Sequence, residues 1–234
     1  NNVALQVGIM ALKAIGLGGV QGLGGSLLMW GPEFEALHHA HLLVDTPRTG
    51  VLEIIAPQTG DTSPEDWAPN DVNAYMTFHW DILKSYSAFA SVYDRFRGPD
   101  AFDASVVRPF NNRVGVHFEK DVLGVFQSRV TRLTMMNHRE HVIGPAPLIG
   151  IKLNKATAFR GTLATMADRA RDLITKQDIS GVSCYRFTPP AGATASIPQM
   201  RNLSVSYLTV LGDYLLVSNS EALLQRAIAT KREG

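Results

Sequence analysis

The stretch LSVSYLTVLGDYLLVSNSEALLQRAIATK, residues 203–231, decides the fold class of this chain. Two runs rich in β-branched and aromatic residues flank Gly212-Asp213, a glycine-led pair that is typical of a two-residue hairpin turn. Ser218 and Glu221 then stand at capping-box spacing before an amphipathic run, and Ser220 is also expected to help cap this helix. The stretch therefore predicts a strand, a tight turn, a second strand and a helix in immediate succession.

Apolar periodicity extends this assignment to the rest of the chain. The predicted helices are 3–14, 81–97 with Asp81 as its cap, 119–129, 155–176 with Asn154 as its N-cap, and 221–231. The predicted strands are 37–45, 71–79, 131–138, 147–154, 182–188, 203–211 and 213–219. Because strands mostly follow one another in pairs with helices between the pairs, the order predicts an α+β fold with antiparallel sheet and packed amphipathic helices.

Loops rich in proline, glycine, serine and threonine divide the chain, at 57–70, 97–112 and 189–202. The loop 97–112 is the predicted boundary between an N-terminal α+β subdomain, residues 1–100, and a C-terminal α+β subdomain, residues 101–234. The ends, which begin without methionine and stop just after a helical pattern, indicate a processed or excised part of a longer protein.

Composition excludes several classes of function. Of 234 residues, 45% are hydrophobic and 18% charged, a balance typical of a folded globular protein. The 22 basic and 21 acidic residues are intermixed without a Lys/Arg run, which argues against a nucleic-acid partner. The single cysteine, Cys184, excludes an intramolecular disulfide and a cysteine-cluster metal site, and its strand-like context predicts burial.

The segment AIGLGGVQGLGGSLLMW, residues 14–30, contains six glycines and raises the possibility of a phosphate-binding loop. Such a loop needs a strand before the glycines and a helix after them, so that backbone amides face the phosphates. Here a helix-like run precedes the glycines and a strand-like run follows. We therefore expect a helix end, a glycine-rich connection and a first strand, and no cofactor is predicted.

Histidines supply the one metal hypothesis. In LHHAHLL, His39 and His41 share one face of the predicted strand and His38 lies on the other, while His138 and His141 stand three apart in NHREH. Two such pairs have the ligand chemistry for zinc or copper, but no carboxylate stands at a third ligand position and no zinc-hydrolase motif is present. A solvated strand face is the preferred interpretation, with metal binding or partner contact as alternatives.

Acid–base and aromatic candidates are sparse. Asp61, Glu65 and Asp66 fall in a polar loop that we expect to be solvated, and no pair of carboxylates is assigned as acid and base. Trp67 lies in the same proline-rich loop, where we expect it to pack onto the protein's own core, with an interface role as the alternative. No catalytic residue is therefore predicted.

Four segments, PRTGVLEIIAP, VNAYMTFHWDILKSY, PLIGIKLNKATAFRGTLATM and GDYLLVSNSEALLQRAI, together resemble a bacterial domain-of-unknown-function family of large exported or envelope-associated proteins. The resemblance rests on extended segments that end in an Asp- or Asn-led helix and on the order strand, Gly-Asp turn, strand, Ser-x-Ser-Glu, helix. It implies an extracytoplasmic or cell-envelope location and a non-enzymatic role, and it brings no catalytic residues.

We expect a non-catalytic interaction or scaffolding component of a larger envelope-associated or multi-subunit assembly, with a protein partner and no nucleic acid. Membrane proximity would come through parts outside this chain. One alternative is a small-ligand or lipid-binding module, in which the apolar segment 3–30 and a curved sheet enclose a cavity. A second alternative is a metal-dependent hydrolase that uses the two histidine pairs.

Overall fold

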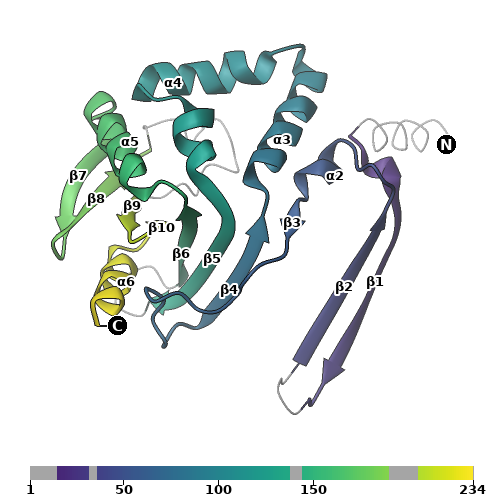
Figure 1. Ribbon diagram of the computed structural model, residues 1–234, viewed down its shortest axis with the longest axis horizontal. Coiled ribbons are helices and arrows are strands. Elements are labelled where there is room, and N and C mark those ends of the chain that lie inside the picture. The colour runs from purple at the N-terminus through teal and green to yellow at the C-terminus, as the bar shows by residue number, and fades with distance from the viewer. Residues whose placement is uncertain (1–14, 32–35, 138–143, 190–204, 234) are drawn as a thin grey trace. The chain divides into compact units, whose positions relative to one another are not determined.

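The computed structural model describes residues 15–31, 36–137, 144–189 and 205–233. These residues form an α+β protein with two antiparallel sheets and packed helices, as the sequence predicts (Figure 1). The predicted helix at 3–14 lies outside the described residues. By the contacts within each, the chain divides into two units: residues 1–56 with 84–102, and residues 57–83 with 103–234.

The first unit contains a two-stranded hairpin and a small aromatic cluster. Its strands and short helices are η1 (Leu17–Gly19), β1 (Val20–Met29), β2 (Ala36–Val44) and α2 (Val51–Ile54), joined by most of α3 (Ile82–Arg97). Phe102 is buried, and the rings of Tyr86, Phe89 and Tyr93 lie 5.4–5.6 Å from its centroid in edge-on contacts. These aromatic side chains from the predicted apolar stripe of α3 provide the packing of this unit.

The second unit is built on a sheet of eight strands in the order β3-β4-β5-β6-β10-β9-β8-β7, antiparallel throughout. The strands are β3 (Pro57–Gln58), β4 (Ala74–Trp80), β5 (Phe126–Asn137), β6 (Gly144–Leu153), β7 (Ile174–Ile179), β8 (Val182–Phe187), β9 (Ser206–Leu211) and β10 (Tyr214–Ser218). The helical segments are η2 (Asp103–Val107), α4 (Arg108–Val114), η3 (Phe118–Val122), η4 (Leu123–Val125), α5 (Ala156–Arg169) and α6 (Glu221–Glu233).

Both faces of this sheet are covered by helices, because its strands alternate apolar side chains on the two sides. Leu215 on β10 packs with the cluster that includes Phe159 and Leu163 of α5. Its neighbour Leu216 packs with the cluster that includes Leu224 of α6 on the opposite face. Successive residues of a strand point to opposite faces, so α5 and α6 lie on opposite sides of the sheet.

Within the described residues 205–231, the chain follows the predicted order of strand, Gly-Asp turn, strand and helix, as β9, β10 and α6. Gly212 has a left-handed φ of 60°, and the Gly212-Asp213 turn pairs Leu211 with Tyr214. The expected cap at Ser220 is confirmed, since its hydroxyl accepts the backbone N–H of Leu223 at 3.3 Å. The capping box predicted from Ser218 is wrong. The Ser218 hydroxyl instead donates to the Pro147 carbonyl of β6.

The predicted helix 155–176 is too long. α5 ends at Arg169, and Ile174–Ile179 forms the edge strand β7, which turns through Ser180 and Gly181 into β8. Both turn residues have positive φ, which is the geometry of a two-residue hairpin. The Ser180-Gly181 pair is therefore the feature of the sequence that indicates this turn. The predicted N-cap is also wrong. The Asn154 side-chain amide donates to the Gly124 carbonyl at 3.4 Å, and no side chain forms a capping hydrogen bond with the first turn of α5.

Two further predictions about local structure need correction. The predicted helix 119–129 consists of the short turns η3 and η4, and the chain from Phe126 belongs to β5. The predicted loop 97–112 holds η2 and the start of α4, whose first turn begins with Arg108-Pro109, a proline position that a helix tolerates. Within the described residues, no helix combines the length and apolar character needed to span a membrane.

Candidate functional site

The hairpin of β1 and β2 is the candidate functional site, because it presents apolar side chains to solvent on both faces. The strands pair antiparallel from Val20 opposite Val44 to Met29 opposite Ala36, with one irregularity between Val20 and Gly22. No Lys, Arg, Asp or Glu occurs on either strand. The usual charged residues of a solvent-exposed strand are therefore missing from a hairpin that lies in solvent.

One face of the hairpin is almost entirely apolar. Residues directly opposite each other in an antiparallel pair share a face, which gives this face Leu23, Gly25, Leu27 and Met29 from β1 and Ala36, His38, Ala40 and Leu42 from β2. Leu23 is 79% exposed, and Leu27 and Met29 are each about half exposed. Trp30, which follows β1 directly, is 86% exposed. Soluble proteins seldom expose a continuous apolar strip of this kind without a use for it.

The second face mixes apolar side chains with two histidines. It carries Gly22, Gly24, Ser26 and Leu28 from β1 and Leu37, His39, His41 and Leu43 from β2. The Ser26 hydroxyl and His39 Nδ1 are hydrogen-bonded at 3.2 Å, and the rings of His39 and His41 are 6.2 Å apart. The predicted placement of His39 and His41 on one face, with His38 on the other, is confirmed.

The second histidine pair, His138 and His141, lies outside the described residues, so the distance between the two pairs is not part of the structure. Among the residues that are described, no three His, Cys, Asp or Glu side chains lie together in a way that could hold a metal ion. The metal hypothesis therefore stays a prediction.

Both outer edges of the hairpin are unpaired within the described part of the chain. An unpaired edge offers a row of backbone N–H and C=O groups to any other strand, and proteins usually protect such edges with charge, proline or a covering element. β1 and β2 have neither charge nor proline. The hairpin thus combines apolar faces with open backbone edges.

The root of the hairpin is held by close backbone contact between two glycines. Gly16 and Gly50 both have positive φ, and a Cβ at Gly16 would lie 2.8 Å from the Cα of Gly50. The Val51 N–H donates to the Ile15 carbonyl at 2.8 Å across the same contact. Because Gly22, Gly24 and Gly25 belong to β1 itself, the expected glycine-rich connection before the strand is wrong for these residues.

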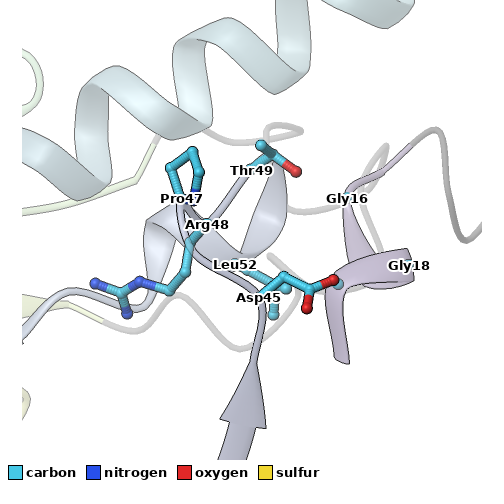
Figure 2. A pocket seen from close by; sticks show the side chains of 8 residues that line it. Gly16, Gly18, Asp45, Pro47, Arg48, Thr49 and Leu52 are labelled. Carbon is cyan, nitrogen blue, oxygen red and sulfur yellow. The ribbon is translucent and has the colours of Figure 1, made fainter. Parts of the chain in front are cut away.

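A groove of about 370 Å³ adjoins this root (Figure 2). Its two charged side chains point away from each other in Figure 2 and have partners of their own: Asp45 accepts from Gln21 at 2.9 Å, and Arg48 donates to the Ile55 carbonyl. No helix follows the glycines, so the strand–loop–helix order of a phosphate site is not formed here. The groove is formed by residues of the root of the hairpin.

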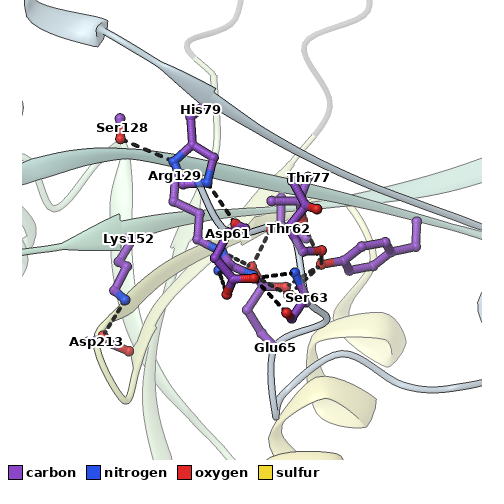
Figure 3. A network of polar contacts seen from close by, with 12 residues as sticks. Asp61, Thr62, Ser63, Glu65, Thr77, His79, Ser128, Arg129, Lys152 and Asp213 are labelled. Atoms are coloured by element: carbon purple, nitrogen blue, oxygen red, sulfur yellow. Dashed lines mark hydrogen bonds and ion pairs between the residues drawn. The ribbon is translucent and has the colours of Figure 1, made fainter. Parts of the chain in front are cut away.

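A second polar feature lies in the sheet unit, where Arg129 of β5 is buried against the loop after β3 (Figure 3). Arg129 donates from Nε to Glu65 at 2.8 Å, from Nη1 to Asp61 at 2.9 Å, and from Nη2 to the Ser63 carbonyl. The Glu65 side chain is only 3% exposed, so the expectation that this carboxylate is solvated is wrong. Asp61 and Asp66 are largely exposed, as predicted.

Hydroxyl groups complete this network around Glu65. Thr131 donates to Glu65 Oε1, and the Tyr75 hydroxyl lies 3.2 Å from Oε2 and 2.6 Å from the Thr77 hydroxyl. Burial alone would lower the pKa of Arg129, but its hydrogen bonds to Asp61 and Glu65 outweigh burial and raise it. Hydrogen bonds from Ser63, and then from Arg129, hold the pKa of Asp61 below its usual range.

This network anchors the loop after β3. Each oxygen and nitrogen named above has a partner inside the network. At its margin, the Ser128 hydroxyl and His79 Nδ1 are hydrogen-bonded at 3.3 Å. His79 adds to the anchor, since its ring bonds the Asp61 carbonyl at 2.7 Å and packs against Gly60. Sequence periodicity could not reveal this cluster, because its members come from three separate segments.

Two other predicted positions are confirmed as core residues. Cys184 is fully buried on β8, and burial raises the pKa of its thiol, which makes a nucleophilic role unfavourable. Trp67 is fully buried in the same cluster, packing edge-on against Tyr214 at 5.5 Å. Its alternative role as an interface residue is therefore wrong.

Comparisons of this chain with protein-family models, with curated proteins and with solved structures found no match.

Proposed function

We propose that this protein is a non-catalytic interaction component of a larger assembly and that the hairpin β1–β2 is the element that contacts its protein partner. The observation that carries the proposal is the exposure of Leu23, Trp30 and Leu43, between 65% and 86%, on strands without charged residues. Exposed apolar patches with open strand edges mark protein–protein contact sites in soluble proteins.

The way in which the described polar groups are used supports the same proposal. The most buried polar cluster, around Arg129 and Glu65, is internally satisfied. The histidines of the hairpin have Ser26 as their described polar neighbour and no carboxylate on the same strands. The hairpin carries the most exposed of the large apolar side chains that the structure describes, Trp30 and Leu23, at 86% and 79%.

The proposal is tested by the native mass of the protein recovered from cells that express it. Wild-type protein should migrate in a species heavier than the 25.5 kDa of the chain, and the double variant Leu23→Ser/Leu42→Ser should lose that species. Met76→Ser is the matched control, since it removes a half-exposed apolar side chain from β4 instead. A wild-type protein that is strictly monomeric and without a partner would overturn the proposal.

We also propose a cell-envelope location for this assembly, which rests on the sequence resemblance to exported or envelope-associated proteins. Fractionation of cells that express the full gene product is the direct test. Recovery with the envelope or periplasm is expected, and recovery with the cytosol would contradict this part of the proposal while leaving the role of the hairpin open to its own test.

A further inference from the structure

A groove of about 580 Å³ lies in the sheet unit between α5 and the strands β7, β8 and β9. This volume is within the range of small-molecule binding sites. Leu163 of α5 and Tyr185 and Val210 of the sheet, all buried, form its apolar floor. The groove is separate from the hairpin in sequence and belongs to the other unit of the chain.

A glycine in α5 keeps this groove open. Gly161 lines it, and a Cβ built at that position would meet no atom within 4 Å. Glycine inside a helix costs about 0.5–1 kcal/mol relative to alanine, and no close packing at this position requires it. Ala164, one turn further on, also presents a small side chain to the groove. The helix therefore leaves free the space that larger residues would fill.

The two walls of the groove each contribute a cation. Arg160 stands on α5 and donates to the Gly212 carbonyl at 3.0 Å, which leaves further N–H groups of its guanidinium for a ligand. Lys176 stands on β7 opposite Tyr185 and makes no hydrogen bond or ion pair with the residues that the structure describes. A third cation lies close by, since Arg232 Nη2 is 3.3 Å from the position of a Cβ on Gly181.

The neighbouring carboxylates are already engaged. Asp178, on the same face of β7 as Lys176, accepts the Gly181 N–H at 2.7 Å. Asp168 of α5 lies 3.8 Å from Arg171, and Asp66 pairs with Lys231. Asp178 keeps its negative charge, because its partner is a neutral N–H group. Three cations, Arg160, Lys176 and Arg232, stand against this one carboxylate, so the rim of the groove carries excess positive charge above an apolar floor.

We infer that this groove binds a small anionic amphiphile, that is, a carboxylate or phosphate group attached to an apolar chain. The anionic group lies between Arg160 and Lys176, where charge-assisted hydrogen bonds are available from both walls. The apolar chain lies along Leu163 and Val210, where it displaces water from apolar surface. This site adds a ligand to a protein whose proposed partner contact lies elsewhere.

Calorimetric titration of the whole chain with decyl phosphate and with decanoate, below their micelle concentrations, tests this inference. One equivalent of each anionic amphiphile is expected to bind. The cationic decyltrimethylammonium and the uncharged decyl maltoside should bind at least tenfold more weakly. Vesicles containing phosphatidylglycerol form a separate arm: binding to vesicles without binding to the free amphiphiles would overturn the site in favour of a membrane surface. Equal binding of the cationic and anionic probes would overturn it as well.

Variants locate the binding in the groove. Arg160→Gln and Lys176→Gln should each raise the Kd for decyl phosphate by about tenfold, because each variant removes one charge-assisted contact with the ligand. Gly161→Leu should abolish binding by filling the groove, while the matched control Gly161→Ala keeps it and melts at a higher temperature. Ala164→Leu is a second filling variant, should Gly161→Leu fail to fold. Retained binding in a folded, filled variant would contradict the inference.

The hairpin variant Leu23→Ser/Leu42→Ser separates this inference from the proposed function. It should bind decyl phosphate as the wild type does, because neither residue lines the groove. Loss of the heavier native species without loss of amphiphile binding, or the reverse, then identifies which of the two proposals has failed.

Discussion

At the scale of single residues, the sheet unit has a close contact between Trp67 and Gly150. Trp67 is fully buried, and a Cβ on Gly150 would lie 2.7 Å from its Cη2 atom. The absence of a side chain on this central strand is therefore what admits the indole ring. The indole N–H has no hydrogen-bond partner in the described part of the chain, so shape and not polarity holds the ring.

Gly150→Ala should lower the free energy of unfolding by about 1–3 kcal/mol, the usual penalty for overpacking a core. Trp67→Phe in the same chain should recover part of this loss, because phenylalanine lacks the outer ring atoms that the new methyl group meets. Denaturant unfolding of the single and double variants measures the coupling. Strictly additive losses would show that the two residues do not share this contact.

The second residue-scale prediction concerns alkaline pH. Burial raises the pKa of Cys184, Tyr185 and Tyr214 above their ordinary values of 9.0 and 10.0. These groups therefore stabilise the folded state fully below pH 9, and this stabilisation is lost as pH rises, because the unfolded chain releases their protons first. Each such proton contributes a slope of about 1.4 kcal/mol per pH unit.

Urea unfolding between pH 8 and pH 11 checks this dependence. Stability should fall from about pH 9 upward, and Tyr214→Phe should reduce the slope above pH 10 while leaving stability near pH 8 almost unchanged. A slope in Tyr214→Phe equal to that of the wild type would contradict the assignment of this tyrosine.

At the scale of elements, the loop between β3 and β4 depends on the ion pair of Arg129 and Glu65. Glu65→Leu should lower the free energy of unfolding by about 3 kcal/mol, because it removes the buried partner of a buried guanidinium. Arg129→Met/Glu65→Leu should recover part of this loss, since no buried charge then lacks its partner.

The exposed pair of Arg226 and Asp71 provides the control for this experiment. Both side chains are about half exposed, so Asp71→Ala should change stability by less than about 1 kcal/mol. Thermal or urea unfolding of the variants checks the comparison. A loss in Glu65→Leu no larger than that in Asp71→Ala would show that the buried network contributes little.

The elements also show which structure could be predicted from the sequence. The predicted strands at 37–45, 182–188 and 213–219 correspond closely to β2, β8 and β10, because their apolar and β-branched runs end at turn residues. β7 was not predictable from periodicity, since Leu173 and Ile174 continue the apolar spacing of α5. The two elements are separated at Ala170, where the backbone leaves the helical conformation. The spacing of apolar residues does not indicate this change.

The candidate site was predictable only in part. The alternation in LHHAHLL predicts which histidines share a face, and the structure confirms it. The exposure of the hairpin could not be predicted, because apolar residues such as Leu23 and Leu43 carry the same pattern whether a sheet face is covered or open. The sites around Arg160 and Arg129 depend on contacts between segments that are distant in sequence. The periodicity of a single segment carries no information about such contacts.

At the scale of the whole molecule, the core and the surface proposed for partner contact use different side chains. The sheet unit is stabilised by residues such as Leu216 and Leu224, which are fully buried, whereas the large side chains of the hairpin are exposed. The surface proposed for the partner can therefore change without loss of the core.

Leu23→Ser/Leu42→Ser should accordingly leave the free energy of unfolding within about 0.5 kcal/mol of the wild type, as exposed substitutions usually do. Leu216→Ala, the buried counterpart, should lower it by about 2–5 kcal/mol. Denaturant unfolding of both variants measures the difference. A large loss in the hairpin variant would mean that these side chains support the fold, which would weaken its use in the native-mass experiment.

The lack of charge on β1 and β2 has a consequence for how a cell handles this protein. Apolar strands without gatekeeping charges pair readily with copies of themselves and with other exposed strands. Chains made in excess of their partner would expose this hairpin to chaperones and proteases, which remove such species. On the proposed function, the amount of the protein in the cell should therefore follow the supply of its partner, and the hairpin would set the stoichiometry of the assembly as well as its contact.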